Sequence, residues 1–152
     1  MKTYDIGVVG LGVMGQNLAL NIASKGFSVV GFDVDSEKAR ASERKWSGKD
    51  MSTTPSLAAL VEALKTPRKI LIMVPAGKPV DAVIGELKPL LEKGDILIDG
   101  GNSFFQDTIR RGRELEAVGI NFIGSGVSGG EEGALHGPSL MPGGLEAAYR
   151  QV

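Results

Sequence analysis

The sequence predicts an α/β fold: a doubly wound, mostly parallel sheet with helices on both faces. Short apolar runs alternate with stretches of helical periodicity, as is typical of strands joined by helices in a parallel sheet. Many of the 22 glycines stand at the ends of apolar runs, where strand-to-helix turns are expected. The first apolar run leads directly into a glycine-rich turn over residues 10–15. Residues 1–152 contain no linker or internal repeat, so we expect one domain.

Residues 4–9 predict the first strand, and the residues after it predict the first helix. Met14, Leu18 and Ile22 recur every four residues, which places them on one apolar helix face. Gly26 follows as the expected C-terminal stop of this helix.

The apolar run at 27–32 predicts the second strand. Ser36 is a suitable N-cap, and residues 37–46 predict a charged surface helix. The polar stretch 47–54 shows no clear helix or strand pattern, apart from a short edge strand expected near Met51.

Residues 56–64 predict a third helix, with Pro67 beyond its end. The continuous apolar run at 69–74 is typical of a parallel strand that is buried on both faces. A helix is expected from about Pro79, where proline fits the first turn, and Pro89 is expected to kink or split it.

Residues 95–99 predict a further strand, and 104–117 a helix that stops at Gly119. A strand at 120–123 and a turn-rich tail follow. A helical pattern begins at 145–149, just before the sequence ends, so we expect a fragment or an isolated domain.

Composition excludes several classes of function. The formal net charge of −1 gives no reason to expect nucleic acid or an anionic membrane as a partner. With no cysteine, the chain cannot form disulfides or thiolate metal sites, and we expect no metal. There is no signal-peptide pattern and no apolar run long enough to span a bilayer, which fits a cytoplasmic enzyme domain.

The glycine turn, Gly10-Leu11-Gly12-Val13-Met14-Gly15, follows a strand and opens a helix, as in the dinucleotide fingerprint of Rossmann-like folds. Gly10 allows the sharp turn, Gly12 lets a pyrophosphate approach the backbone, and Gly15 lets the helix lie close to the sheet. The helix N-terminus offers N–H groups and a partial positive charge to the phosphates. These six residues are therefore predicted to bind a cofactor; the alternative is a glycine-rich turn with a structural role alone.

The end of the second strand indicates which cofactor is preferred. Asp33 lies about twenty residues beyond the glycines, where a carboxylate binds the 2′-hydroxyl of NAD and repels the 2′-phosphate of NADP. Val34 stands where NADP enzymes often have arginine, and Asp35 adds negative charge that Lys38 and Arg40 could partly offset. The sequence therefore predicts NAD in preference to NADP. Alternatively, Asp33 and Asp35 only cap the following helix.

Two later segments stand where ligands bind in open α/β sheets, beyond the carboxyl ends of strands. In residues 99–103, Asn102 offers a donor and an acceptor; the alternative is an ordinary turn with Asn102 or Ser103 as N-cap. In residues 128–134, successive glycine N–H groups beside Ser128 could hold an anion, although Glu131 and Glu132 are close; a loop without function is the alternative.

Several other side chains are expected to be structural. His136 is the single histidine, lies in a glycine-rich stretch and is not predicted to bind metal. Trp46 is expected to pack against a neighbouring element.

Three nearby arginines are expected to form a solvated helix face rather than a phosphate site. Asp107 with Arg111, and Arg110 with Glu114, have the i,i+4 spacing of surface ion pairs. Arg110, Arg111 and Arg113 are therefore not predicted to bind a ligand.

Taken together, the motifs resemble the 6-phosphogluconate dehydrogenase family. The resemblance runs from residue 4 to the end and includes 10–19 (GLGVMGQNLA), 99–103 (DGGNS), 126–134 (GVSGGEEGA) and 137–144 (GPSLMPGG). The last two motifs are more specific than the glycine fingerprint, which the wider β-hydroxyacid dehydrogenase family shares.

This resemblance implies an oxidative decarboxylation in which 6-phosphogluconate passes a hydride to a nicotinamide and loses carbon dioxide to give ribulose 5-phosphate. It implies that the glycine turn holds the pyrophosphate and that residues 33–35 hold the adenosine ribose. Val74, Pro75 and Ala76 match a loop beside the cofactor. Asn102 matches a residue that contacts the nicotinamide ribose and the substrate. The substrate segment of the family matches the run Ser128, Gly129 and Gly130.

Two departures from the family pattern matter. The Asn-Arg-Thr typical of NADP-type members is replaced by Asp33-Val34-Asp35, which agrees with a preference for NAD. The family's lysine base, in a Lys-x-x-His-Asn motif, and its helical dimerisation domain are not in this sequence, so no catalytic residue is assigned and we expect the chain alone to be inactive. Alternatives are a domain of another β-hydroxyacid dehydrogenase and a nucleotide-binding module without catalysis.

Overall fold

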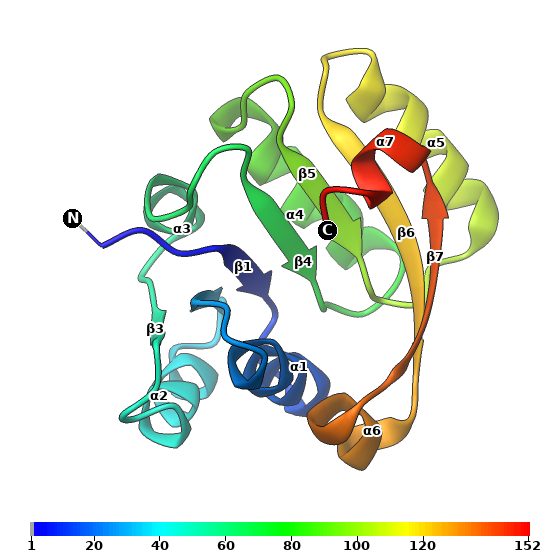
Figure 1. Ribbon diagram of the computed structural model, residues 1–152. Helices are drawn as coiled ribbons and strands as arrows, with labels where there is room; N and C mark the ends of the chain where they lie inside the picture. Colours follow the sequence, from blue (N-terminus) through cyan, green and yellow to red (C-terminus); the bar gives the residue numbers. More distant parts are fainter. Residues whose placement is uncertain (1) are drawn as a thin grey trace.

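The computed structural model describes residues 2–152 and contains one seven-stranded sheet (Figure 1). The strand order is β3-β2-β1-β4-β5-β6-β7. Neighbouring strands are parallel throughout except for β7, which runs antiparallel to β6. The predicted fold class, a doubly wound and mostly parallel sheet, is therefore confirmed.

Six of the strands lie close to the predicted ones, and the last, β7, was not predicted. They are β1 (Ile6–Val9), β2 (Val29–Phe32), β3 (Met51–Thr53), β4 (Lys69–Ile72), β5 (Ile96–Asp99), β6 (Asn121–Ser128) and β7 (Ser139–Gly144). The helices over the described residues are α1 (Val13–Ser24), α2 (Ser36–Lys45), α3 (Leu57–Glu62), α4 (Lys78–Leu87), α5 (Phe105–Glu116), α6 (Gly130–His136) and α7 (Glu146–Tyr149). A 3-10 turn at Lys88–Leu90 follows α4 and confirms that Pro89 interrupts this helix.

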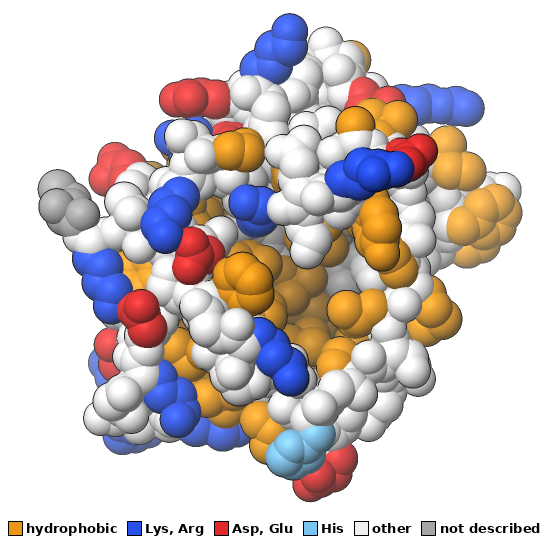
Figure 2. All heavy atoms as spheres, viewed as in Figure 1, with side chains coloured by type: hydrophobic (Ala, Val, Ile, Leu, Met, Phe, Trp, Pro, Cys, Tyr) orange, Lys and Arg blue, Asp and Glu red, His pale blue; other side chains and the backbone are white. Residues whose placement is uncertain are grey.

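Two apolar layers form because successive strand residues point to opposite faces of the sheet. Val9 and Val30 belong to the layer that contains residues of α3, α4 and α5. Their neighbours Val8 and Val29 belong to the layer with residues of α1 and α6. Helices therefore cover both faces, as predicted. The cover is incomplete on the second face, where Figure 2 shows apolar side chains in a hollow between α1 and α7.

Trp46 packs against a neighbouring element, as predicted. It follows the last residue of α2 and is 1% exposed. The indole lies on Gly31 of β2, where an added Cβ would stand 2.8 Å from the ring. The side chain therefore fixes the end of α2 on the sheet.

Two local expectations were wrong. Asp35, rather than Ser36, caps α2, with its carboxylate accepting a hydrogen bond from the Glu37 backbone N–H at 2.9 Å. The turn-rich tail is an ordered unit instead: β6 continues to Ser128, α6 follows, and β7 returns along β6. All six residues of β7 are exposed, so the strand lacks the apolar alternation by which a half-buried strand is recognised.

Asp5 joins the start of β1 to two other parts of the fold. Its carboxylate accepts hydrogen bonds from the Ser28 backbone N–H at 2.8 Å, the Ser28 hydroxyl at 2.7 Å and the Lys65 ammonium at 2.7 Å. These contacts, with Lys65 the largest contributor, lower the pKa of Asp5 to about 2. The contribution of Asp5 to stability is therefore complete above the pKa of an unfolded aspartate, about 3.9, and is lost as the pH falls through the folded value.

Asp5→Asn is expected to lower the free energy of unfolding by on the order of 1–2 kcal/mol at pH 7, a figure reduced for solvent screening. The difference from wild type should shrink as the pH falls from 4 towards 2. Urea unfolding monitored by Trp46 fluorescence measures it. Asp50→Asn is a matched control, since Asp50 pairs with Lys2 and both are more than half exposed. A penalty for Asp5→Asn that does not change with pH would contradict the assignment.

Candidate dinucleotide site

The candidate site lies at the carboxyl edge of the sheet, where the topology changes direction. β1 and β4 are neighbours, but the helices that follow them, α1 and α4, pack in different apolar layers. Such a switch point leaves a crevice between the two connections, and ligands of open α/β sheets bind there. The loops after β1, β2, β4 and β5 all leave the sheet at this edge (Figure 1).

Two glycines of the turn are closely packed within the fold, whereas the third faces free space. Gly10 has φ +96°, and a Cβ there would stand 2.5 Å from the Met73 carbonyl oxygen. A Cβ on Gly15 would stand 1.9 Å from the Gly10 carbonyl oxygen. Beyond its two chain neighbours, no heavy atom lies within 4 Å of the corresponding position at Gly12. The fold thus needs Gly10 and Gly15, whereas Gly12 opens onto space that a pyrophosphate could use, beside the first amides of α1.

Asp33 connects the end of β2 to the glycine turn. Its carboxylate oxygens accept hydrogen bonds from the Leu11 backbone N–H at 2.7 Å and the Asp35 backbone N–H at 2.8 Å. Asp35 caps α2, so the capping alternative holds for that residue. A carboxylate has about four lone-pair positions, and two therefore stay free for ribose hydroxyls. Val34 is 89% exposed beside it.

The β5–α5 loop (residues 100–104) lies directly against the β4–α4 loop (residues 73–77). A Cβ on Gly100 would stand 2.5 Å from the Met73 sulfur, and one on Gly101 2.7 Å from the Val74 carbonyl oxygen. Pro75 and Ala76, which follow Val74, are exposed at this edge. A side chain at Gly101 would therefore push the two loops apart, whereas one at Gly100 would displace the Met73 side chain.

Asn102 joins the β5–α5 loop to β6. It has φ +56°, its side-chain amide donates to the Val127 carbonyl oxygen at 3.1 Å, and its amide oxygen accepts from the Val127 N–H at 2.8 Å. Neither Asn102 nor Ser103 caps α5, whose N-cap is Phe104. The next residues along β6 and beyond, Ser128, Gly129 and Gly130, are exposed. The structure therefore brings Asn102 to the start of the predicted substrate segment.

The charged residues next to that segment point into solvent. Glu132 and His136 form an i,i+4 pair with 3.4 Å between the imidazole Nε2 and the carboxylate, and both side chains are at least 70% exposed. Glu131 is exposed as well. Over residues 2–152, no group of three or more potential ligands could hold a metal ion, and no helix has the length and apolarity needed to cross a bilayer.

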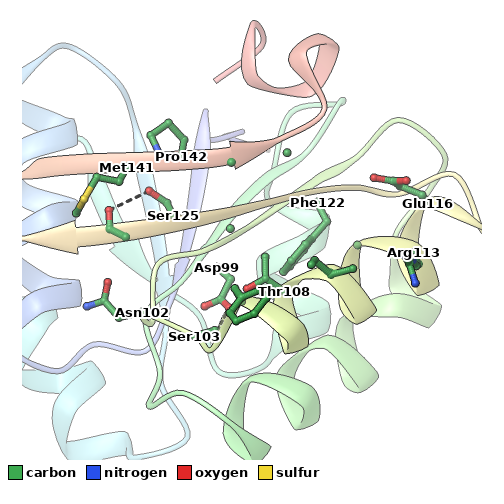
Figure 3. A pocket seen from close by; sticks show the side chains of 17 residues that line it. Asp99, Asn102, Ser103, Thr108, Arg113, Glu116, Phe122, Ser125, Met141 and Pro142 are labelled. Atoms are coloured by element: carbon green, nitrogen blue, oxygen red, sulfur yellow. Dashed lines mark hydrogen bonds between the residues drawn. The ribbon is translucent and has the colours of Figure 1, made fainter.

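A groove of about 690 Å³ adjoins this edge and was missed because β7 was not predicted. It runs between α5 and the β6–β7 ribbon (Figure 3). Asp99, Asn102 and Ser103 line it together with Arg113 and Glu116 of α5. The glycine turn and Ser128 do not line it. Asn102 is thus common to the groove and to the loops of the candidate site.

The expectation of a solvated arginine face was half wrong. Arg110 is 44% exposed and pairs with Glu114, as predicted, and also with Asp107. Arg111 is 1% exposed and does not pair with Asp107. It lies four residues before the buried Leu115, on the helix stripe that faces the sheet, and this spacing was the available signal.

Comparison with protein families and known proteins gives a consistent result. Residues 5–152 match the family model described as the NAD binding domain of 6-phosphogluconate dehydrogenase. The chain is 59% identical over 152 residues to the decarboxylating 6-phosphogluconate dehydrogenase of Salmonella typhimurium, and 58% identical to that of Escherichia coli. All of this chain and 32% of each relative are covered.

Solved structures agree with this. A 6-phosphogluconate dehydrogenase of Plasmodium falciparum, described with NADP+ as its cofactor and 6-phosphogluconate as its substrate, superposes with a TM-score of 0.92 at 40% identity, over 97% of this chain and 32% of that one. A 3-hydroxyisobutyrate dehydrogenase of Mycobacterium tuberculosis superposes with a TM-score of 0.84 over 98% of this chain and 49% of that one. At 24% identity, this second likeness concerns the fold alone.

Proposed function

This chain belongs to the family of NAD binding domains of 6-phosphogluconate dehydrogenase, and we propose that it binds the dinucleotide cofactor for such an enzyme, with NAD preferred to NADP. The observation that carries the proposal is Gly12, which opens onto free space at the switch point of the sheet while Gly10 and Gly15 are closely packed. The pyrophosphate lies there, against the N-terminus of α1.

The preference for NAD rests on charge at the end of β2. Asp33 is held beside the glycine turn, where an NADP 2′-phosphate would meet a negative carboxylate, and the exposed Val34 supplies no cation. Of the two nearby cations, Arg40 is bound to Glu37 at 2.6 Å, which leaves Lys38. The family and the Plasmodium structure support NAD(P) binding in general.

The two halves of the cofactor occupy different loops in this proposal. Residues 33–35 bind the adenosine ribose, and the β4–α4 loop with Asn102 lies at the nicotinamide. Ser128, Gly129 and Gly130 hold the substrate. This arrangement is supported by the contact between the two loops and by the bridge from Asn102 to Val127, next to Ser128.

The chain spans about a third of the length of its curated relatives. We propose that residues 1–152 are one Rossmann-like domain of a protein that oxidises and decarboxylates 6-phosphogluconate. In this proposal, a helical domain supplies the catalytic base and the contacts of a homodimer. The names of the relatives support the decarboxylating activity. The helical domain, the base and the homodimer rest on the family resemblance alone.

Parallel fluorescence titrations of the chain with NADH and NADPH test the proposed function. Tighter binding of NADH supports both the site and the role of Asp33. Equal or tighter binding of NADPH would overturn the preference and direct attention to Lys38. Binding of neither cofactor would overturn the proposed function itself.

The chain alone is expected to bind cofactor without oxidising 6-phosphogluconate, because the sequence has no Lys-x-x-His-Asn motif. A general base contributes a factor of about 10²–10⁴ to such rates. Formation of NADH from NAD and 6-phosphogluconate, measured by absorbance, checks this. Turnover at a rate comparable with that of a full-length relative would contradict it.

A further inference from the structure

Arg111 is a buried charged side chain that the proposed function does not yet use. It lies on α5 and is 1% exposed, whereas its neighbour Arg110 is 44% exposed. A guanidinium keeps its charge at any accessible pH, and burying it is costly unless its N–H groups are well paired. The partners of Arg111 therefore show what this burial achieves.

Those partners come from both loops on the nicotinamide side of the candidate site. The Arg111 guanidinium donates to the Gly77 carbonyl oxygen at 3.1 Å and to the Asp81 carboxylate at 2.8 Å, at the start of α4. It also donates to the Ser103 hydroxyl of the β5–α5 loop at 3.1 Å and to the buried carboxylate of Asp99, the last residue of β5, at 3.5 Å. One planar group thus spans the ends of the β4–α4 and β5–α5 loops.

A second set of contacts continues this network into the site. The Ser103 hydroxyl donates to Asp99, and the other Asp99 oxygen accepts from the Gly101 N–H at 2.9 Å. Gly101 packs against the Val74 carbonyl group, and the adjacent Asn102 reaches β6. The order of the β5–α5 loop therefore depends on groups that Arg111 holds.

We infer that Arg111 is a positioning residue for the nicotinamide half of the cofactor, because its guanidinium fixes the β4–α4 loop relative to the β5–α5 loop. This rests on the proposed function. None of its partners belongs to the glycine turn or to residues 33–35, which receive the adenosine half. Loss of Arg111 should therefore affect the nicotinamide half of the cofactor and not the adenosine half, whereas loss of a merely structural residue would affect both.

The test compares NADH with ADP, which carries only the adenosine and phosphate part. In Arg111→Met, the Kd for NADH is expected to rise by about tenfold or more, while the Kd for ADP stays within about twofold of wild type. Calorimetry measures both. Arg111→Lys should restore NADH binding only partly, because a single ammonium group cannot bind all the acceptors that surround the planar guanidinium. Arg110→Met is the matched control, since Arg110 also pairs with Asp81 but is exposed.

Equal losses for NADH and ADP, or no loss for either, would overturn the inference. If Arg111→Met does not fold, Ser103→Ala provides the same comparison, since it removes one acceptor and leaves the pair with Asp81. Its Kd for NADH should rise while that for ADP does not, and any other result counts against the inference. Wild-type chain that binds neither ligand would overturn the proposed function instead.

Discussion

Gly12→Ala is expected to remove NADH binding while leaving the fold intact. Beyond the two chain neighbours, no heavy atom lies within 4 Å of the position that the new methyl group would take, and φ −65° with ψ −176° suits any L-residue. Alanine is a poorer N-cap than glycine, so the free energy of unfolding should fall by no more than about 1 kcal/mol. A pyrophosphate that approaches the turn would meet the methyl group. We expect the Kd for NADH to rise by about 100-fold or more, which corresponds to about 2.7 kcal/mol.

Gly15→Ala is the matched comparison, because the same methyl group there meets protein instead of space. It would stand 1.9 Å from the Gly10 carbonyl oxygen, so the turn and α1 must separate. The expected loss of stability is about 3 kcal/mol, together with a loss of NADH binding. Urea unfolding monitored by Trp46 fluorescence and titration with NADH distinguish the two variants. Gly12→Ala that binds NADH as tightly as wild type would show that the pyrophosphate does not lie at this turn.

The sequence predicted the shape of the glycine turn well because most of its requirements are local. The positive φ of Gly10 and the contact of Gly15 with the Gly10 carbonyl oxygen are set within the turn, although Gly10 also packs against Met73 of the distant β4–α4 loop. The same holds for the interruption of α4 by Pro89, since proline lacks the N–H that a helix interior needs.

Long-range contacts decided the features that were not predicted. An exposed i,i+4 ion pair contributes only about 0.3–0.5 kcal/mol, so the spacing of Asp107 and Arg111 could not outweigh the buried partners of Arg111. Those partners lie 8 to 34 positions away in the sequence. Ser103 does not cap α5 because its hydroxyl binds Asp99, four positions before it, and Arg111, eight positions after it. The bridge from Asn102 to Val127 is also long-range.

The double variant Asp33→Asn/Val34→Arg is expected to reverse the cofactor preference from NADH to NADPH. A phosphate with nearly two charges, about 5 Å from a carboxylate in a water-like dielectric, is repelled by about 1.7 kcal/mol, more than a tenfold change in Kd. An arginine at position 34 contributes an attraction of similar size. The ratio of the two Kd values should therefore change by about 100-fold or more.

The single variants separate the two contributions. Val34→Arg changes an 89% exposed side chain and should tighten NADPH binding without affecting NADH. Asp33→Asn should weaken NADH and relieve the repulsion of NADPH. In wild type, the two carboxylate oxygens of Asp33 accept hydrogen bonds from the backbone N–H groups of Leu11 and Asp35. The single amide oxygen of Asn can replace only one of these acceptors, so the free energy of unfolding should also fall by about 1 kcal/mol. If Asp33→Asn lowers stability but leaves the ratio of NADH to NADPH affinity unchanged, then Asp33 supports only the glycine turn and does not face the ribose.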